Sequence, residues 1–145
     1  MVKKIKIFNN FKITRKFKNS LILIGNFDGL HSGHQKLFKE AQKYKNKFKI
    51  KIGVVTFDPI PKMFFNKKIM NYRISNFNQK VSYLNKFGVD FLINKNFNKK
   101  FSKIKSIDFI KEIIFKKLDA KYIFVSNNFR FGYRREGDVN LLKNY

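Results

Sequence analysis

Short, continuous apolar runs alternate along this chain with stretches of helical periodicity, and the alternation restricts the fold more than any other feature. Residues 21–24 read Leu-Ile-Leu-Ile, a pattern typical of a strand buried on both faces. Residues 33–48 then place Leu37, Phe38, Ala41 and Tyr44 on one helical face. Residues 50–57, 91–93 and 122–125 are predicted to form further buried strands, separated by helices. Strands joined by helices indicate an α/β protein with a doubly wound, parallel sheet.

The predicted element ends carry residues that suit them. Pro59 and Pro61 lack the N–H that a central strand needs, so the strand at 50–57 ends there. Ser75 is the predicted N-cap of a helix that stops at Gly88. Ser106 is the predicted N-cap of the next helix. We expect Asp108 near the positive end of that helix and an apolar face made of Ile107, Ile110, Ile113, Ile114 and Leu118. An edge strand is expected at residues 5–8, and a last helix from about Val139.

The composition excludes several classes of protein. The chain has 145 residues, a usual length for one domain, and 43% of them are hydrophobic, which supplies a core. No apolar run exceeds four residues, so we predict neither a transmembrane helix nor a signal peptide. There are no cysteines, which excludes disulfides, zinc ribbons and thiol nucleophiles. We therefore expect a cytoplasmic protein.

The net charge of +24 has two explanations. An excess of this size suggests nucleic acid or an anionic membrane surface as a partner. However, the cations are 28 lysines and only five arginines, scattered among many Asn, Ile and Phe residues as an A/T-rich coding sequence produces. Recognition surfaces favour clusters and Arg, so we favour compositional drift and expect no nucleic-acid or membrane partner. Arg130, Arg134 and Arg135 fall within six residues and are the more informative cations.

Polar loops follow three of the predicted strands, where ligands bind in open α/β sheets: 25–34, 57–65 and 126–138. The first loop contains both histidines of the chain, His31 and His34. Gly29 and Gly33 let the backbone approach a bulky anion closely. The helix start supplies free N–H groups and the positive end of a dipole. These features together predict a phosphate site.

The same loop has alternative interpretations. The histidines could decorate the surface, cap the helix or bind a metal. Asp28 is the one further metal-binding side chain nearby, so we predict no zinc site with three protein ligands. The agreement of position, glycines and histidines favours the phosphate site.

Three motifs resemble a known family. His31-Ser32-Gly33-His34 has the form His-x-Gly-His, the ATP-phosphate signature of the nucleotidyltransferase superfamily, which has a Rossmann-like fold. GNFDGLHSGH at residues 25–34 resembles the opening of the adenylyltransferase module of bacterial FAD synthetase. TFDPIPKMFF at 56–65, and NNFRFG at 127–132 with GDV at 137–139, are similar to segments of the same family in the same order. The resemblance spans about residues 21–142.

The resemblance implies synthesis of FAD from FMN and ATP, with release of pyrophosphate. The FMN phosphate is the nucleophile, and Mg²⁺ is held largely by the phosphates rather than by a metal site of the protein. His31 and His34 are expected to hold the ATP phosphates as charge develops. Asn26 is expected to shape the site and Asp28 to orient the loop. Gly25, Phe27, Gly29 and Gly33 are assigned to ATP-phosphate binding.

The flavin ring is expected beside the second and third motifs. Phe57, with Pro59 and Pro61, forms a rigid loop suited to a planar isoalloxazine ring. Asn128 and Arg130 are assigned to the flavin and phosphate site, because an amide and a guanidinium suit ring carbonyls and phosphate. Arg134 is a secondary candidate.

Two family features are missing from the sequence. A Ser/Thr-rich segment of the form Ile-Ser-Ser-Thr-x-x-Arg grips the triphosphate opposite the histidines, and nothing matches it before Tyr145. The C-terminal riboflavin kinase module is absent as well. We therefore expect residues 1–145 to be an incomplete FMN adenylyltransferase domain, a fragment with much reduced turnover on its own. Ser126-Asn127 also departs from the Gly and acidic residue of the family.

Two other functions stay open. One is a nucleotidyltransferase of the same superfamily with a different phosphate-bearing acceptor, such as pantetheine phosphate. The motifs at 56–59 and 128–132 argue against it. The other is a basic nucleic-acid-binding module, whose binding would fall steeply with salt. No oligomeric state is predicted.

Overall fold

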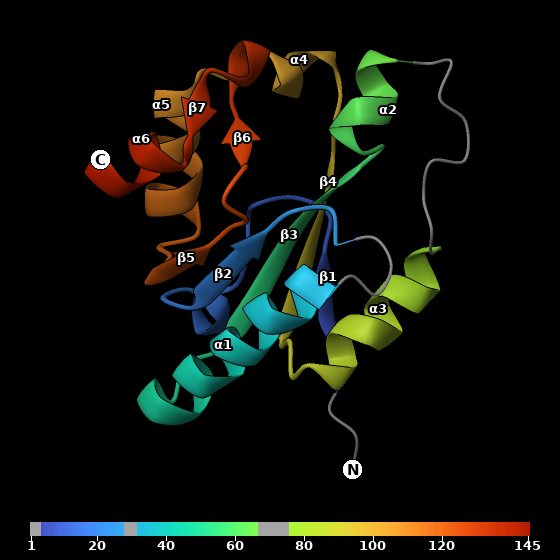
Figure 1. Cartoon of the computed structure of the whole chain (residues 1–145), viewed down its shortest axis with the longest axis vertical. Coiled ribbons are helices and arrows are strands. Elements are labelled where there is room, and N and C mark those ends of the chain that lie inside the picture. The colour runs from blue at the N-terminus through green and yellow to red at the C-terminus, as the bar shows by residue number, and fades with distance from the viewer. Residues whose placement is uncertain (1–3, 28–31, 67–75) are drawn as a thin grey trace.

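A five-stranded parallel sheet forms the centre of the molecule (Figure 1). The structure is a computed structural model and describes residues 4–27, 32–66 and 76–145. The spatial order of the strands is β1-β4-β3-β2-β5. Their bounds are β1 Lys6–Phe8, β2 Leu21–Ile24, β3 Ile52–Asp58, β4 Phe91–Asn96 and β5 Tyr122–Phe124. The predicted parallel sheet is therefore confirmed.

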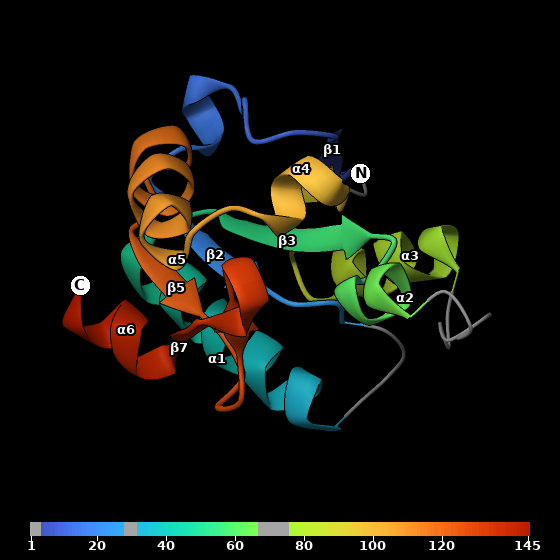
Figure 2. The ribbon, with the colours of Figure 1, turned by 90° about the horizontal axis from the view of Figure 1, so that it is seen from above.

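Helices cover both faces of the sheet, as expected of a doubly wound fold (Figure 2). Helices α1 (Ser32–Phe48) and α3 (Phe77–Lys86) bury Phe38, Ala41 and Leu84 on one face. On the other face lies α5 (Ser106–Asp108), which continues into the π-helical η2 (Phe109–Lys117). The remaining elements are η1 Arg15–Phe17, α2 Pro61–Phe65, α4 Lys99–Ser102, β6 Arg130–Phe131, η3 Tyr133–Arg135, β7 Gly137–Asp138 and α6 Val139–Asn144.

Several local predictions are confirmed. The apolar run at 21–24 is β2, and all four of its residues are buried. The N-terminal strand β1 lies at the sheet edge beside β4. Gly88 has φ +75° and follows the end of α3, as a glycine after a helix C-terminus should. The apolar run of β2 and the glycine after α3 depend on local sequence, whereas the edge position of β1 depends on its pairing with β4.

Two predicted helix caps are wrong. Helix α3 is capped by Asn76, whose side chain accepts from the Gln79 N–H while the Gln79 side chain accepts from the Asn76 N–H, so the cap is not Ser75. Ser75 itself lies outside the described residues. Ser106 is the first residue of α5 rather than its N-cap, because the Glu136 carboxylate accepts from the Ser106 N–H at 2.9 Å and does the capping from a distant loop.

Two predicted burial patterns are also wrong. Ile107 is 36% exposed, whereas Ile110, Ile113 and Ile114 of the same segment are buried. The strand at 122–125 is β5, shorter than predicted and only half-buried, because it lies at the edge of the sheet with β2 as its partner. Burial on both faces requires an interior position, which the run of apolar residues does not specify.

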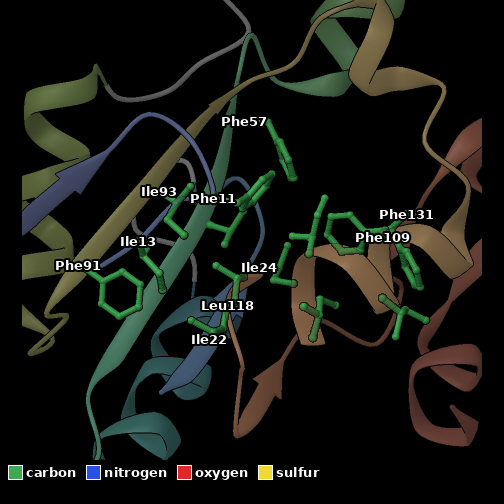
Figure 3. Close-up of a cluster of buried hydrophobic side chains, with 14 of the residues drawn as sticks. Phe11, Ile13, Ile22, Ile24, Phe57, Phe91, Ile93, Phe109, Leu118 and Phe131 are labelled. Atoms are coloured by element: carbon green, nitrogen blue, oxygen red, sulfur yellow. The ribbon is translucent and has the colours of Figure 1, made fainter. Parts of the chain in front are cut away.

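The contact between Gly53 and Phe91 sets the alignment of β3 and β4. The two residues are register partners, and a Cβ atom on Gly53 would lie 2.2 Å from the Phe91 ring. The Phe91 ring in turn packs against Phe17 at 4.9 Å and Phe8 at 6.2 Å. Figure 3 shows Phe91 among the buried side chains between the sheet and η2. A glycine is required at position 53 for this ring to pack against the strand.

A buried carboxylate joins α1 to the amino ends of β3 and β4. The Asp90 side chain is 2% exposed and lies 3.0 Å from the Lys45 ammonium. Asp90 also accepts from the Ile52 N–H at 2.9 Å. Lys45 donates to the Gly88 carbonyl at 2.7 Å. One ion pair therefore holds three elements together on the side of the sheet away from the polar loops.

We predict that Lys45→Ala lowers the free energy of unfolding by about 2–3 kcal/mol, because it removes the ammonium group that lies 3.0 Å from the buried Asp90 carboxylate. Lys43→Ala is the matched control on the same helix. Its partner Glu40 is 3.5 Å away and both side chains are more than half exposed. This change should cost under about 0.5 kcal/mol. Urea unfolding measures both values, and equal small losses would contradict the role of the Lys45–Asp90 pair.

Candidate functional site

The order of the strands creates a switch point between β2 and β5. The chain passes from β2 to β3 across one face of the sheet and from β4 to β5 across the other. The chain therefore reverses its direction across the sheet between β2 and β5, the point at which ligands bind in this type of sheet. Residues 25–27, the described part of the predicted phosphate loop, directly follow β2 at this point.

The turn after β2 is anchored by an aromatic ring. Gly25 donates its N–H to the Val55 carbonyl at 3.1 Å, which ties the turn to β3. Phe27 has φ +48° and is 3% exposed. Its ring packs edge-on against His34 at 5.2 Å and against Phe38 at 5.1 Å. The Phe27 side chain belongs to the core and holds the turn against α1. Its role in ATP-phosphate binding stays a prediction.

His34 is the third residue of α1 and Gly33 is the second. The ring of His34 is half-buried and its Nδ1 atom is buried. Helix α1 has 17 residues and no acidic residue in its first turn, so its N-terminal N–H groups present an uncompensated positive dipole end. This arrangement favours an anion beside His34.

Other predicted members of this loop are only partly described. Asn26 is half-buried between Gly25 and Phe27. Asp28, Gly29 and His31 lie outside the described residues. Their roles stay predictions.

An aromatic cluster continues beneath the turn. The Phe38 ring packs against Tyr83 at 5.9 Å and against Phe87 at 5.3 Å. The Tyr83 hydroxyl is buried, and among the described residues it has no hydrogen-bond partner. This burial raises the pKa of Tyr83 above its ordinary value of 10.0. The phenol is therefore neutral at physiological pH and is part of the apolar support for α1.

The predicted flavin contacts Phe57, Pro59 and Pro61 lie in two different environments. Phe57 is 9% exposed, and its ring packs against Phe97 at 5.8 Å and Phe101 at 5.7 Å. Figure 3 shows Phe57 with the core side chains. Pro59 is half-buried, and Pro61 begins α2 and is also half-buried. The prolines form the turn that carries α2, whereas the Phe57 ring supports it from below.

Asn128 and Arg130 make hydrogen bonds within their own segment. Asn128 is exposed and accepts from the Ser126 hydroxyl at 2.9 Å. Arg130 donates from Nε to the Arg135 carbonyl at 3.1 Å, and its Nη1 atom is 4.0 Å from Asp138. Both side chains stabilise the loop after β5. Their contact with a flavin stays a prediction.

A pocket of about 520 Å³ opens where α2, α4 and η3 meet at the carboxyl edge. Figure 2 shows the three elements around the ends of the strands. The pocket is lined by Phe64, Phe65, Lys99, Ser102, Lys103, Tyr133 and Arg134. None of the five predicted flavin contacts, all of which are described, lines it.

Of this lining, Arg134 is the only predicted site residue, although Phe64, Phe65 and Tyr133 lie within the predicted ligand loops 57–65 and 126–138. Three segments far apart in the chain assemble the lining. One usable signal was the aromatic pair Phe64–Phe65 shortly after Pro61. A second was the pair of lysines four residues apart shortly after the strand at 91–93.

The fold and this site define an α/β domain of the kind that binds nucleotides at the switch point of a doubly wound sheet. The chain belongs to the FAD synthetase family, whose family model matches residues 13–145. The predicted family is therefore confirmed.

Curated relatives share most of this chain. The bifunctional riboflavin kinase/FMN adenylyltransferase of Buchnera aphidicola (subsp. Acyrthosiphon pisum, strain APS) is 42% identical over 125 residues, which are 86% of this chain and 40% of that protein. The protein of the same name from Escherichia coli K12 is 34% identical over 123 residues, 85% of this chain and 39% of that protein. The chain thus spans about 40% of the length of these relatives.

A solved structure shares the fold. A crystal structure described as a macrolide-efflux protein from Streptococcus pneumoniae has a TM-score of 0.79 and 28% identity, covering 100% of this chain and 47% of that one. The efflux description applies to that protein. Within the described ranges of this chain, no helix combines the length and apolar character needed to cross a membrane.

We predict that Gly132→Ala destabilises the loop that lines the pocket. Gly132 has φ +81°, and a Cβ atom there would lie 2.7 Å from the Ser106 backbone. Gly88→Ala is the matched control, because Gly88 has φ +75° but open space, with its nearest neighbours 3.8 Å away. The control should lose about 1 kcal/mol from backbone strain alone.

Gly132→Ala should lose a further 1–3 kcal/mol or so through overpacking. Urea unfolding of both variants measures the difference. Equal losses would show that the close approach to Ser106 is not a constraint.

Proposed function

We propose that this chain carries the FMN adenylyltransferase activity named for its relatives, forming FAD and pyrophosphate from FMN and ATP. The observation that carries the proposal is the turn Gly25–Phe27 with His34, held at the switch point of a parallel sheet. Membership of the FAD synthetase family supports the same reaction. Residues 1–145 would be the adenylyltransferase domain, working on small molecules in the cytoplasm.

The reaction is an adenylyl transfer. An oxygen of the FMN phosphate attacks the α-phosphorus of ATP, a new P–O–P bond forms, and the bond to the β-phosphate breaks to release pyrophosphate. The transferred group passes through a charged transition state, so catalysis depends on positioning and charge neutralisation. No protein nucleophile takes part.

His34 and the α1 N-terminus are proposed to hold the ATP phosphates. The imidazole donates to a phosphate oxygen, and the free N–H groups of the helix stabilise the same negative charge. His31 is proposed to act beside His34, with Gly29 and Gly33 allowing close backbone approach. Mg²⁺ would add charge neutralisation on the phosphates, and those phosphates are proposed to hold it. Within the described residues, no three His, Asp or Glu side chains gather into a metal-binding group.

The flavin ring is proposed to bind in the pocket between α2, α4 and η3. Its volume of about 520 Å³ suits a three-ring system, and Phe64, Phe65 and Tyr133 supply aromatic surface. Phe65 and Tyr133 are 65% and 40% exposed, so a bound ring would cover aromatic surface that now faces solvent. The prolines of the β3–α2 turn place this wall.

We expect His34→Ala to lower the rate of FAD formation roughly 10²-fold, because it removes one donor to the developing phosphate charge. Gln35→Ala, the next residue of the same helix and also half-buried, is the control and should retain its rate. A single-turnover assay with labelled ATP and FMN detects product even where turnover is slow. Unchanged FAD formation by His34→Ala would contradict the phosphate role.

Flavin fluorescence distinguishes this function from nucleic-acid binding. The protein should quench FMN fluorescence, and the quenching should survive roughly 0.5 M NaCl, where the screening length is about 4 Å. A nucleic-acid-binding module would leave FMN fluorescence unchanged and lose DNA steeply with salt. That result would contradict the proposed function.

A further inference from the structure

Three cationic side chains surround the mouth of the pocket. Lys99 and Lys103 come from α4 and its C-cap, and Arg134 comes from η3. The two lysines are four residues apart on a helical turn, so they lie on the same face. All three residues are exposed. We call them the cationic rim.

The cationic rim has no acidic partner among the residues that the structure describes. Within the described part of the chain, neither lysine nor Arg134 forms an ion pair, whereas Lys45 and Arg130 have acidic partners. Like charges at this spacing on a helix repel one another. An anion at the mouth of the pocket would relieve that repulsion, and low-dielectric aromatic walls would focus the field on it.

Arg134 is held in place by its surroundings. Its guanidinium lies over the Tyr133 ring at 5.1 Å, a cation–π contact. The loop is tied to the start of α5, since the Tyr133 N–H donates to the Ile104 carbonyl at 2.6 Å. Arg134 itself has φ +53°, in the left-handed region that non-glycine residues seldom adopt. The cation–π contact therefore orients the exposed guanidinium toward the Tyr133 ring, which lines the pocket.

The pocket thus combines an aromatic interior with a positive mouth. Phe64 and Phe65 pack against one another at 5.2 Å and form the apolar wall. A ligand that matches both parts has a planar apolar ring system and an anionic group on a short flexible arm. FMN has this form, whereas riboflavin has the ring and the arm without the phosphate.

Resting on the proposed flavin site, we propose that Lys99, Lys103 and Arg134 bind the FMN phosphate in the binary complex and so select phosphorylated over unphosphorylated flavin. Selection takes place before ATP is engaged. Loss of its charge should therefore weaken FMN binding in the absence of ATP and raise KM for FMN.

The test is the affinity of each variant for FMN and for riboflavin, measured by flavin fluorescence quenching at constant salt. The variant Lys99→Ala/Lys103→Ala should bind FMN about tenfold more weakly. It should bind riboflavin within about twofold of the unmodified chain, since riboflavin has no phosphate to lose. The matched control is Lys100→Ala/Lys111→Ala, which removes the same charge from two exposed lysines that do not line the pocket. The control should keep both affinities.

Each outcome decides the proposal. A loss confined to FMN in the Lys99/Lys103 variant supports it. Equal losses for FMN and riboflavin would overturn it, since the lysines would then support the ring or the fold. An equal FMN loss in the control variant would also overturn it, because net charge would explain the effect. If the unmodified chain quenches neither flavin, the proposed function itself is wrong.

Discussion

The packing of Phe91 against Gly53 is the contact on which the carboxyl edge of the sheet depends. It holds β3 and β4 in a register that pairs Asp58 with Asn96 at the ends of the strands. A slip of one residue would turn every side chain of one strand to the opposite face. Because the register is held, α2 and α4 begin from neighbouring strand ends, and the pocket between them and η3 follows. Rigidity in the strands thus specifies the geometry of the loops.

Two substrates must meet in the proposed transfer, and the parallel sheet would bring their proposed sites to one edge. The turn after β2 precedes α1, where the ATP phosphates are proposed to bind, while the elements after β3, β4 and β5 form the pocket. The buried Phe27 ring couples this turn to α1. The Lys45–Asp90 pair secures α1 at the other end of the sheet, away from both sites. The Lys45–Asp90 ion pair and the proposed ligand sites therefore lie at opposite ends of the strands.

The features predicted from the sequence are those with short-range causes. The β2 run and the start of α1 depend on neighbouring residues, so periodicity suffices to predict them. The errors came from long-range causes: Glu136 caps α5 from 30 residues away, and β5 is half-buried because of its place in the strand order. Phe57 faces the core, although its motif lies beside the pocket. The sequence does not show this, because in a strand covered on both sides the apolar residues do not reveal which face each side chain takes. The pocket lining also has a long-range cause, because three separate segments supply it.

The charge of +24 attracts any polyanion, so it does not by itself select a partner. Selection requires a feature that one anion can enter and another cannot. The pocket of about 520 Å³ is proposed to hold a single planar ring system, whereas a nucleic-acid strand places its bases and phosphates along an extended surface. Among the many lysines, those at the mouth of such a pocket differ from the rest through their position rather than their charge. Scattered lysines raise the local concentration of anions, and the pocket is proposed to determine which anion binds.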